Sequence, residues 1–303
     1  MDGFLNVLKP PGMTSHDVVN EVRRIVGVRR VGHTGTLDPD VPGVLVVGIG
    51  QAVRLNEYLL DADKAYRGEI TFGIATETGD ATGAVTARQP ASALGRAAVE
   101  DALRAFVGTY EQVPPMLSAV KVGGRRLYEL ARRGADVPRE PRSVTIHSLS
   151  LICFTPGEYP RALFDVVCSK GTYVRTLCED IGRRLGVPAH MSHLVRTRSG
   201  PFTLEASRPL PEIAADVRRC LLPLTAALTT LPRLTIAAEI AGLVARGVPP
   251  RREWFFGAGA LPAKAALIGP DGSLLAIVER AAGGSRPYRY AKVFARGNDG
   301  DDH

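Results

Sequence analysis

One stretch of the chain, VGHTGTLDPDVPGVLVVGIG from Val31 to Gly50, combines a lone carboxylate with the features of a tight loop. Its glycines and prolines predict a turn, and the apolar run after Asp38 predicts a buried strand. His33 and two threonines share the loop, and no Lys or Arg follows Asp38 before Arg54. Two interpretations stay open for a carboxylate at the mouth of a core strand. It could bond backbone N–H groups in the turn, or it could be a nucleophile if an arginine from elsewhere kept it ionised.

A candidate for that arginine lies in the stretch SKGTYVRTL. Gly171 permits a tight turn there, and the alternation of Tyr173 and Arg175 predicts that both point to one side of a strand end. An arginine at such a place is solvated, binds phosphate or pairs with a buried carboxylate. In the stretch KAYRGE, Tyr66 is either a core or edge-strand tyrosine or a platform on which a base stacks.

Other patterns argue against metal and nucleotide cofactors. His190 and His193 lie three residues apart, but no third ligand follows at a spacing typical of a metal site. The stretch GIGQAV contains a GxG but lacks the third glycine, and no GxxxxGK[ST] motif occurs. Arg196 and Arg198 are predicted to contact phosphate.

The elements that must position these residues follow from the spacing of apolar side chains. Val18, Val22 and Ile25 predict a helix that begins after Thr14 or Ser15 and ends at Gly27. The alternation in YRGEITFGIAT predicts a strand, and a helix is predicted after Ser92. The stretch ALFDVVCSKGTYVR predicts a strand that ends in a glycine turn. A further helix is predicted from the apolar spacing of Val174, Leu177, Ile181 and Leu185. The stretch LTTLPRL, near residues 228–233, marks a boundary before a small β-rich segment.

Composition limits the class of protein. The 303 residues are 45% apolar, which is ample for a folded core. No run of about 18 uncharged apolar residues occurs and the N-terminus lacks a secretion pattern, so we expect a soluble cytoplasmic chain. The four cysteines form no CxxC pair and are expected to be reduced thiols. The formal charge of +7 and the excess of arginine favour polyanionic partners.

The motifs together resemble one enzyme family. GHTGTLDPDVPGVLVVGIGQAVRL is similar to the catalytic motif of the TruB-type pseudouridine synthases, which isomerise uridine 55 in the T-loop of tRNA. LNVLKPPGMTSHDVV, KAYRGEITFGIATETGDATG, VPPMLSAVKVGGRRLYELARRG, CSKGTYVRTLCEDIGRRLG and AHMSHLVRTRSGPF resemble further motifs of that family in the same order. The resemblance covers about 200 residues and requires no cofactor or metal.

The resemblance assigns roles residue by residue. It implies that Asp38 is the nucleophile, that Tyr66 stacks on the uracil and takes part in proton transfer, and that Arg175 pairs with Asp38. The substrate-binding residues that it implies are His33, which helps the uridine leave its stack, Leu194, which walls the uracil pocket, and Tyr173, Lys9 and Arg196. Two positions depart from the family pattern. Val41 stands where alanine is usual, and Val195 stands where an arginine commonly follows the pocket leucine.

The resemblance also implies the fold and the partners. We expect a mixed α+β catalytic domain over residues 1–228, with a central, mainly antiparallel sheet flanked by helices. An insertion at about 112–140 is expected to grip RNA, mainly through residues 121–133. Residues 229–303 are expected to form a small β-rich, PUA-like RNA-binding domain with a disordered acidic tail. The expected partner is the T-arm of tRNA, bound by a monomer. The alternative function is a non-catalytic RNA-binding or tRNA-folding protein of the same fold.

Overall fold

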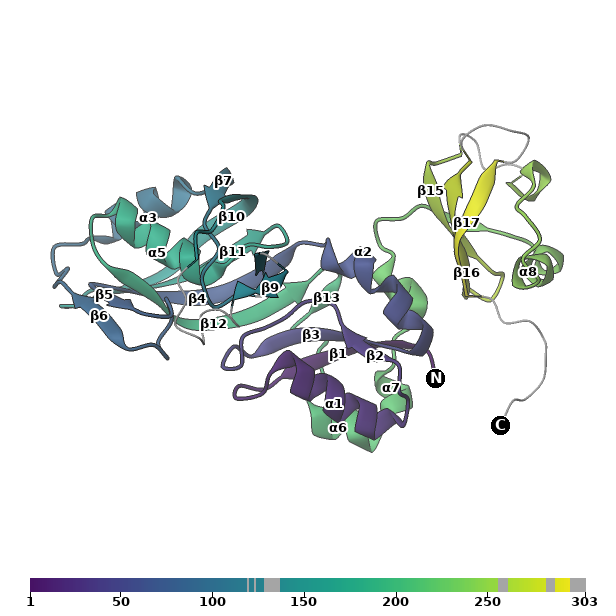
Figure 1. The fold of residues 1–303 in the computed structure, drawn as a ribbon, viewed down its shortest axis with the longest axis horizontal. Coiled ribbons are helices and arrows are strands. Elements are labelled where there is room, and N and C mark those ends of the chain that lie inside the picture. The colour runs from purple at the N-terminus through teal and green to yellow at the C-terminus, as the bar shows by residue number, and fades with distance from the viewer. Residues whose placement is uncertain (119, 123, 128–136, 256–260, 282–286, 295–303) are drawn as a thin grey trace.

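The computed structural model describes residues 1–118, 120–122, 124–127, 137–255, 261–281 and 287–294. A large sheet forms its centre (Figure 1). The strands lie in the order β1 (Gly3–Lys9), β3 (Gly43–Ile49), β12 (Ala189–Ser199), β4 (Lys64–Phe72), β11 (Arg161–Cys168), β10 (Arg142–Thr155) and β7 (Gly108–Gln112). β2 (Val31–His33) pairs with β3, and β13 (Phe202–Thr203) pairs with β12. Only the β3–β12 pairing is parallel among these described strands, so the prediction of a mainly antiparallel sheet is confirmed.

Helices cover the two halves of this sheet separately. α1 (Ser15–Val26) and α6 (Leu210–Ala215) pack beside β1, β2 and β3, whereas α3 (Arg96–Arg104) and α5 (Val174–Arg184) pack against β10 and β12 (Figure 1). Each half has its own cluster of buried apolar side chains. The seam between the halves is the β3–β12 contact, in which Gly43 and Arg196 form the one registered strand pair and Arg196 also bonds the carbonyls of Pro42 and Val44.

The first helix has the ends that its sequence predicts. Thr14 is its N-cap and forms a capping box with Asp17, because each residue's side chain accepts a hydrogen bond from the other's backbone N–H. Gly27 ends the helix in the left-handed conformation at φ 65°. The helix therefore fixes the position of Ser15, whose side chain reaches the loop that carries Asp38.

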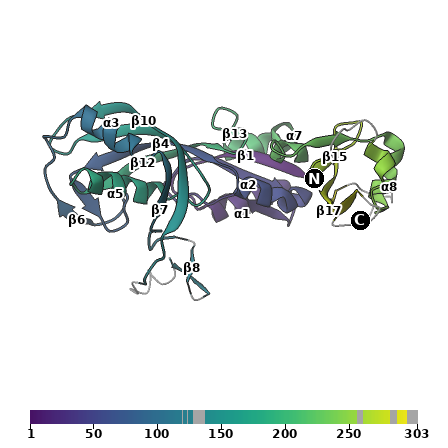
Figure 2. The same ribbon diagram turned by 90° about the horizontal axis from the view of Figure 1, so that it is seen from above.

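Shorter elements complete the described chain. These are η1 (Gly50–Leu55), α2 (Asn56–Leu60), β5 (Ile74–Thr76), β6 (Val85–Arg88), β8 (Lys121–Val122), β9 (Arg125–Arg126), α7 (Val217–Cys220) and η2 (Leu224–Ala227). The β8–β9 hairpin projects away from the large sheet within the predicted insertion (Figure 2). Residues 119, 123 and 128–136 of that insertion lie outside the described residues, so its predicted grip on RNA stays a prediction.

A second, four-stranded sheet follows the predicted boundary. Its order is β14 (Arg233–Thr235), β15 (Lys264–Ile268), β16 (Leu274–Arg280) and β17 (Tyr288–Val293), and α8 (Ala238–Ala245) and η3 (Arg252–Phe255) accompany it (Figure 1). This sheet has a core of its own, which includes Trp254, Leu267 and Val278. The fold is thus a mixed α+β structure with a small β-rich C-terminal part. The acidic tail lies outside the described residues. Within those residues, none of the helices has the length and apolar character needed to cross a membrane.

Candidate active site

The loop between β2 and β3 holds Asp38 between two backbone positions that are pinned from elsewhere. The Ser15 hydroxyl accepts a hydrogen bond from the N–H of Leu37 at 2.9 Å and donates to the carbonyl of Leu37 at 3.2 Å. The carbonyl of Pro39 accepts a hydrogen bond from Lys9 Nζ at 2.6 Å. Because the residues on both sides of Asp38 are held, its carboxylate has a defined place before any ligand binds.

Lys9 is part of this support. Its side chain is fully buried and donates to the carbonyls of Pro10, Met13 and Pro39 at 2.6–2.9 Å. These bonds use all three donors of an ammonium group. Burial lowers the pKa of Lys9 to about 8, although Asp40 and Asp38 oppose the shift. The family resemblance implies that Lys9 binds substrate. In the structure its ammonium group bonds three protein carbonyls, so Lys9 holds the loop instead.

Arg196 supports the same loop from β12. It is 2% exposed, and its guanidinium donates to the carbonyls of Val44 at 2.7 Å, Thr36 at 3.2 Å and Gly35 at 3.1 Å. The predicted contact of Arg196 with phosphate is contradicted by this burial, because each guanidinium nitrogen already bonds protein. At the same seam, a Cβ on Gly43 would lie 2.3 Å from the carbonyl oxygen of Arg196, so the close approach of β3 and β12 requires glycine.

Replacing Arg196 with Met is expected to destabilise the fold by about 3 kcal/mol or more, because three backbone carbonyls lose their donor. Urea unfolding of the purified protein measures the effect. The matched control is Arg198→Met on the same strand, where the partly exposed side chain bonds one described carbonyl, that of Gly200. Equal unfolding midpoints for the two variants would contradict the structural role of Arg196.

Arg175 is the counter-ion that was predicted for Asp38. Its Nε lies 3.1 Å from Asp38 Oδ2, and its terminal nitrogens donate to the carbonyls of Thr78 at 3.2 Å and Leu117 at 3.0 Å. The Arg175 side chain is 7% exposed, whereas that of Asp38 is 43% exposed. The pair is thus arranged with the guanidinium inside the protein and the carboxylate toward the open side. Arg175 lies in the first turn of α5 and not on a strand end, since the chain turns at residues 169–172.

A second carboxylate, that of Asp80, was not among the predicted site residues and shares this arginine. Asp80 Oδ2 lies 3.8 Å from Arg175 Nε. Its Oδ1 accepts hydrogen bonds from the Thr78 hydroxyl and from the hydroxyl and N–H of Thr82. Burial raises the pKa of Asp80, but these hydrogen bonds outweigh it and lower the pKa below its ordinary value. The signal was local: an aspartate flanked by threonines and glycines in TETGDATG is typical of a side chain that bonds its own turn.

The electrostatic balance at Asp38 differs from that at Asp80. Burial raises the pKa of Asp38, and the negative charge of Asp80 adds to the rise. Arg175 opposes the rise through its charge and its hydrogen bond but does not cancel it. Although part of its surface is exposed, the Asp38 carboxyl is enclosed closely enough by protein that it ionises above the ordinary pH range of an aspartate.

Tyr66 and Leu194 line one face of the sheet beside Arg196. Tyr66 on β4 lies opposite Arg196 on β12, and Leu194 lies opposite Gly68, so the four residues share a face. Burial raises the pKa of Tyr66, while the charge of Arg196 and a hydrogen bond with it oppose the shift. The phenol therefore keeps its proton at neutral pH. A Cβ at Gly68 would lie 3.1 Å from Leu194 and 2.6 Å from Phe164, so glycine leaves room for both.

His33 and Tyr173 lie at the ends of neighbouring elements. His33 ends β2, and its Nδ1 accepts a hydrogen bond from the N–H of Gly35 at 3.3 Å. Burial lowers the pKa of His33, as do Arg196 and His16, so the ring is neutral at pH 7 with its proton on Nε2. Tyr173 directly precedes α5. The structure thus brings Arg175 to Asp38 and places Lys9 and Arg196 as buried supports of the Asp38 loop, whereas Tyr173 bonds Gln112 through its backbone.

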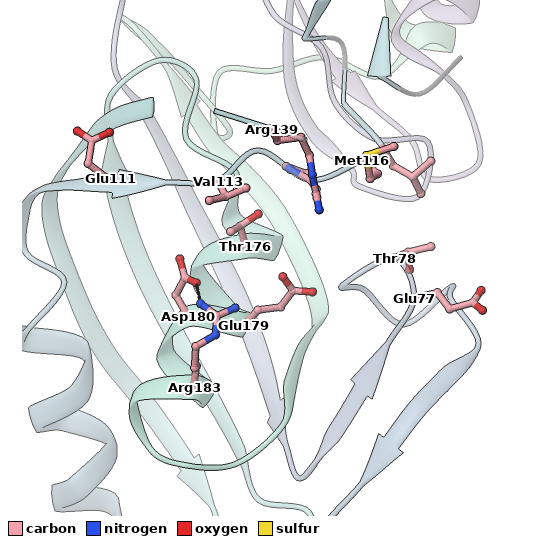
Figure 3. A pocket seen from close by; sticks show the side chains of 12 residues that line it. Glu77, Thr78, Glu111, Val113, Met116, Arg139, Thr176, Glu179, Asp180 and Arg183 are labelled. Carbon is pink, nitrogen blue, oxygen red and sulfur yellow. Dashed lines mark hydrogen bonds and ion pairs between the residues drawn. The ribbon is translucent and has the colours of Figure 1, made fainter. Parts of the chain in front are cut away.

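A pocket of about 500 Å³ lies beside α5 and is lined by Thr176, Glu179 and Arg183 of that helix (Figure 3). Thr78 and Leu117, whose carbonyls bind Arg175, line it, and Arg139 and Glu179 extend toward one another across it. Burial raises the pKa of Glu179. Among the described residues that line this pocket, none is a predicted site residue. In the part of the chain that the structure describes, no group of three or more His, Cys, Asp and Glu side chains could hold a metal ion.

Comparison with known proteins identifies the family. The model of the TruB family pseudouridylate synthase N-terminal domain matches residues 23–174, and the model of the tRNA pseudouridylate synthase B C-terminal domain matches residues 175–229. The chain belongs to the TruB family. It is accordingly an enzyme of the pseudouridine synthase class. The two matched segments meet at Arg175, directly after α5 begins.

Relatives and solved structures agree with this assignment. A TruB relative from Symbiobacterium thermophilum, named tRNA pseudouridine synthase B, is 61% identical over 250 residues, which are 82% of this chain and 83% of the relative. A protein of the same name from Pelotomaculum thermopropionicum is 46% identical over 97% of this chain and 95% of its own. A solved Cbf5–Nop10–Gar1 complex contains a similar chain, with a TM-score of 0.72, 26% identity, and coverage of 97% of this chain and 85% of that one.

The two departures from the TruB pattern have different surroundings. Val41 is 6% exposed and packs in the core cluster beneath the Asp38 loop, beside Leu37. Val195 lies opposite Arg67, on the face of the sheet away from Tyr66 and Leu194. Neither departure therefore introduces a side chain between Asp38 and Arg175.

Proposed function

We propose that this TruB protein isomerises uridine to pseudouridine in tRNA, at position 55 of the T-loop, with Asp38 as the nucleophile. The two relatives described above are both named tRNA pseudouridine synthase B, which supports tRNA as the substrate. The observation that supports the site best is the part-exposed Asp38 carboxylate, 3.1 Å from an arginine that is almost wholly buried. A protein that only binds RNA has no need of such a pair.

The reaction breaks the N1–C1′ bond of uridine, turns the ring and rejoins it through C5. No atom is gained or lost, so the chemistry needs a nucleophile and proton transfer. Asp38 attacks either C1′ or C6, or assists a glycal route, and in each case it must be ionised. Arg175 favours that ionised form, because its charge and its hydrogen bond lower the pKa of Asp38 against the rise that burial causes.

Proton transfer falls to Tyr66. Its phenol stays protonated at neutral pH and lies on the sheet face that also carries Leu194. A uridine extruded from the T-loop stacks on this ring, and such stacking contributes about 1–3 kcal/mol toward the cost of extrusion. Leu194 forms the wall beside it, and the neutral imidazole of His33 and the Tyr173 side chain complete the binding residues. No cofactor takes part.

The remaining parts of the proposal concern binding and location. The protein acts as a cytoplasmic monomer. The insertion at about 112–140 and the PUA-like residues 229–303 bind the T-arm, and the positive charge of the chain favours this polyanion. Recognition rests on the shape of the folded loop more than on base sequence.

Release of tritium from uracil C5 tests the function. Three RNAs carry the label: a full tRNA, an isolated T-arm hairpin, and a tRNA with cytidine at position 55. We expect release from the first two and none at that site from the third. RNA that binds without releasing tritium would favour the non-catalytic alternative. Equal release from the third RNA would contradict position 55 as the target.

A further inference from the structure

The helix that carries Arg175 begins without a cap from its own segment. Tyr173 is the N-cap residue of α5, and its side chain makes no capping hydrogen bond. Gln112, the last residue of β7, instead bonds the backbone of Tyr173 itself. Its Oε1 accepts a hydrogen bond from the N–H of Tyr173 at 2.8 Å, and its Nε2 donates to the carbonyl of Tyr173 at 3.1 Å.

The surroundings of Gln112 fix these two hydrogen bonds to Tyr173. Gln112 is 1% exposed, and its Nε2 also donates to the Tyr110 hydroxyl at 2.6 Å. Both amide protons and the amide oxygen therefore have partners, and the orientation of the amide is determined. A buried side chain that is satisfied in this way allows little displacement of the backbone that it binds.

The segment that follows Gln112 holds the other end of the arginine. The carbonyl of Leu117 accepts the hydrogen bond of a terminal Arg175 nitrogen at 3.0 Å. One stretch of chain, 112–117, thus anchors Arg175 twice: at the root of its helix through Tyr173, and at its guanidinium. The Asp38 contact lies between these anchors, at Arg175 Nε.

We propose that Gln112 is a positioning residue that sets the distance between Arg175 and Asp38, an inference that rests on the proposed function. The contact at 3.1 Å is within hydrogen-bond range, and a displacement of α5 by less than 1 Å would break it. Loss of this hydrogen bond would leave only the attraction between the two charges, which holds the Asp38 carboxylate less firmly. Gln112 touches neither nucleophile nor substrate and acts through Arg175.

The test uses the pH dependence of activity, so the charges around the pair matter. The groups that face Asp38 or Arg175 are Lys9 from β1, Tyr66 from β4, Asp80 from the β5–β6 loop and Glu179 from α5. Gln112 is uncharged, and exchange for methionine changes none of these charges. A movement of the acid limb of the pH profile in that variant therefore reports on the Arg175–Asp38 contact.

The experiment compares kcat, KM and the pH profile of tritium release for wild type, Gln112→Met and Gln112→Asn. Asparagine keeps the amide but is too short to bond both backbone groups of Tyr173. We expect kcat to fall about tenfold with KM for tRNA nearly unchanged, and the acid limb to move to higher pH. Combined with Arg175→Gln, the Gln112 change is expected to cost nothing further. Gln89→Met, on an exposed loop, is the matched control and is expected to behave as wild type.

A lower kcat with an unmoved acid limb, or a loss that adds fully to that of Arg175→Gln, would overturn the proposal. If Gln112→Met does not fold, Gln112→Asn is judged by the same two criteria. Failure of the proposed function is a separate result, since it shows as absent tritium release in the wild-type protein and overturns both proposals. Active wild type with unchanged variants overturns only the role of Gln112.

Discussion

Replacing Asp38 with asparagine is expected to lower kcat for pseudouridine formation by about ten-thousand-fold or more. The amide has nearly the same shape as the carboxylate but no nucleophilic oxygen. The loop that carries it is held through Leu37 and Pro39, so the exchange leaves the backbone in place. Tritium release under single-turnover conditions measures the rate, and filter binding of the same tRNA measures affinity, which is expected to stay near that of the wild type.

Stability separates this result from simple unfolding. Burial raises the pKa of Asp38 above its unfolded value, so the ionised carboxylate opposes folding at neutral pH, and that cost disappears as the pH falls through the folded pKa. Asp38→Asn is therefore expected to unfold in urea at the wild-type midpoint or above it. Asp40→Asn changes an exposed carboxylate in the same loop and serves as the control. Wild-type rates in Asp38→Asn would remove Asp38 from the mechanism.

The sequence predicted those parts of the site that depend on residues close together in the chain. Glycines, prolines and an apolar run predict that Asp38 stands before a buried strand, and the structure has β3 beginning at Gly43. The cap at Thr14 and the stop at Gly27 predict α1, which positions Ser15. The Arg175–Asp38 pairing came from the family resemblance, since nothing in the spacing of two residues so distant fixes their contact.

The missed features depend on partners that are distant in the chain. Arg196 and Lys9 carry side chains that usually stay in solvent, and they are buried here because folding brings backbone carbonyls to them. Strand pairing across the seam placed Gly35 and Thr36 at Arg196, and periodicity does not reveal such pairing. Gln112 was missed for the same reason, because its partners are the backbone groups of Tyr173.

Replacing Arg175 with glutamine is expected to lower kcat by about a hundredfold to a thousandfold, because a buried cation no longer stabilises the ionised nucleophile. The acid limb of the pH profile is expected to move to higher pH. The sign follows from the charges: Arg175 lowers the pKa of Asp38, and its loss leaves burial and Asp80 to raise that pKa further. Activity requires the ionised form, so it then disappears at a higher pH as the solution is acidified. Arg183→Gln changes an exposed arginine of the same helix and is the control.

Asp80→Asn is expected to shift the pH profile of activity in the direction opposite to that of Arg175→Gln. Its negative charge raises the pKa of Asp38, so neutralising it is expected to move the acid limb to lower pH. Asparagine retains an oxygen that can accept from Thr78 and Thr82, which keeps the β5–β6 loop closed. Arg175 then serves one carboxylate instead of two. Shifts of the same sign in Arg175→Gln and Asp80→Asn would contradict an Asp38 whose ionisation is set by these two neighbours, since one removes a positive charge and the other a negative one.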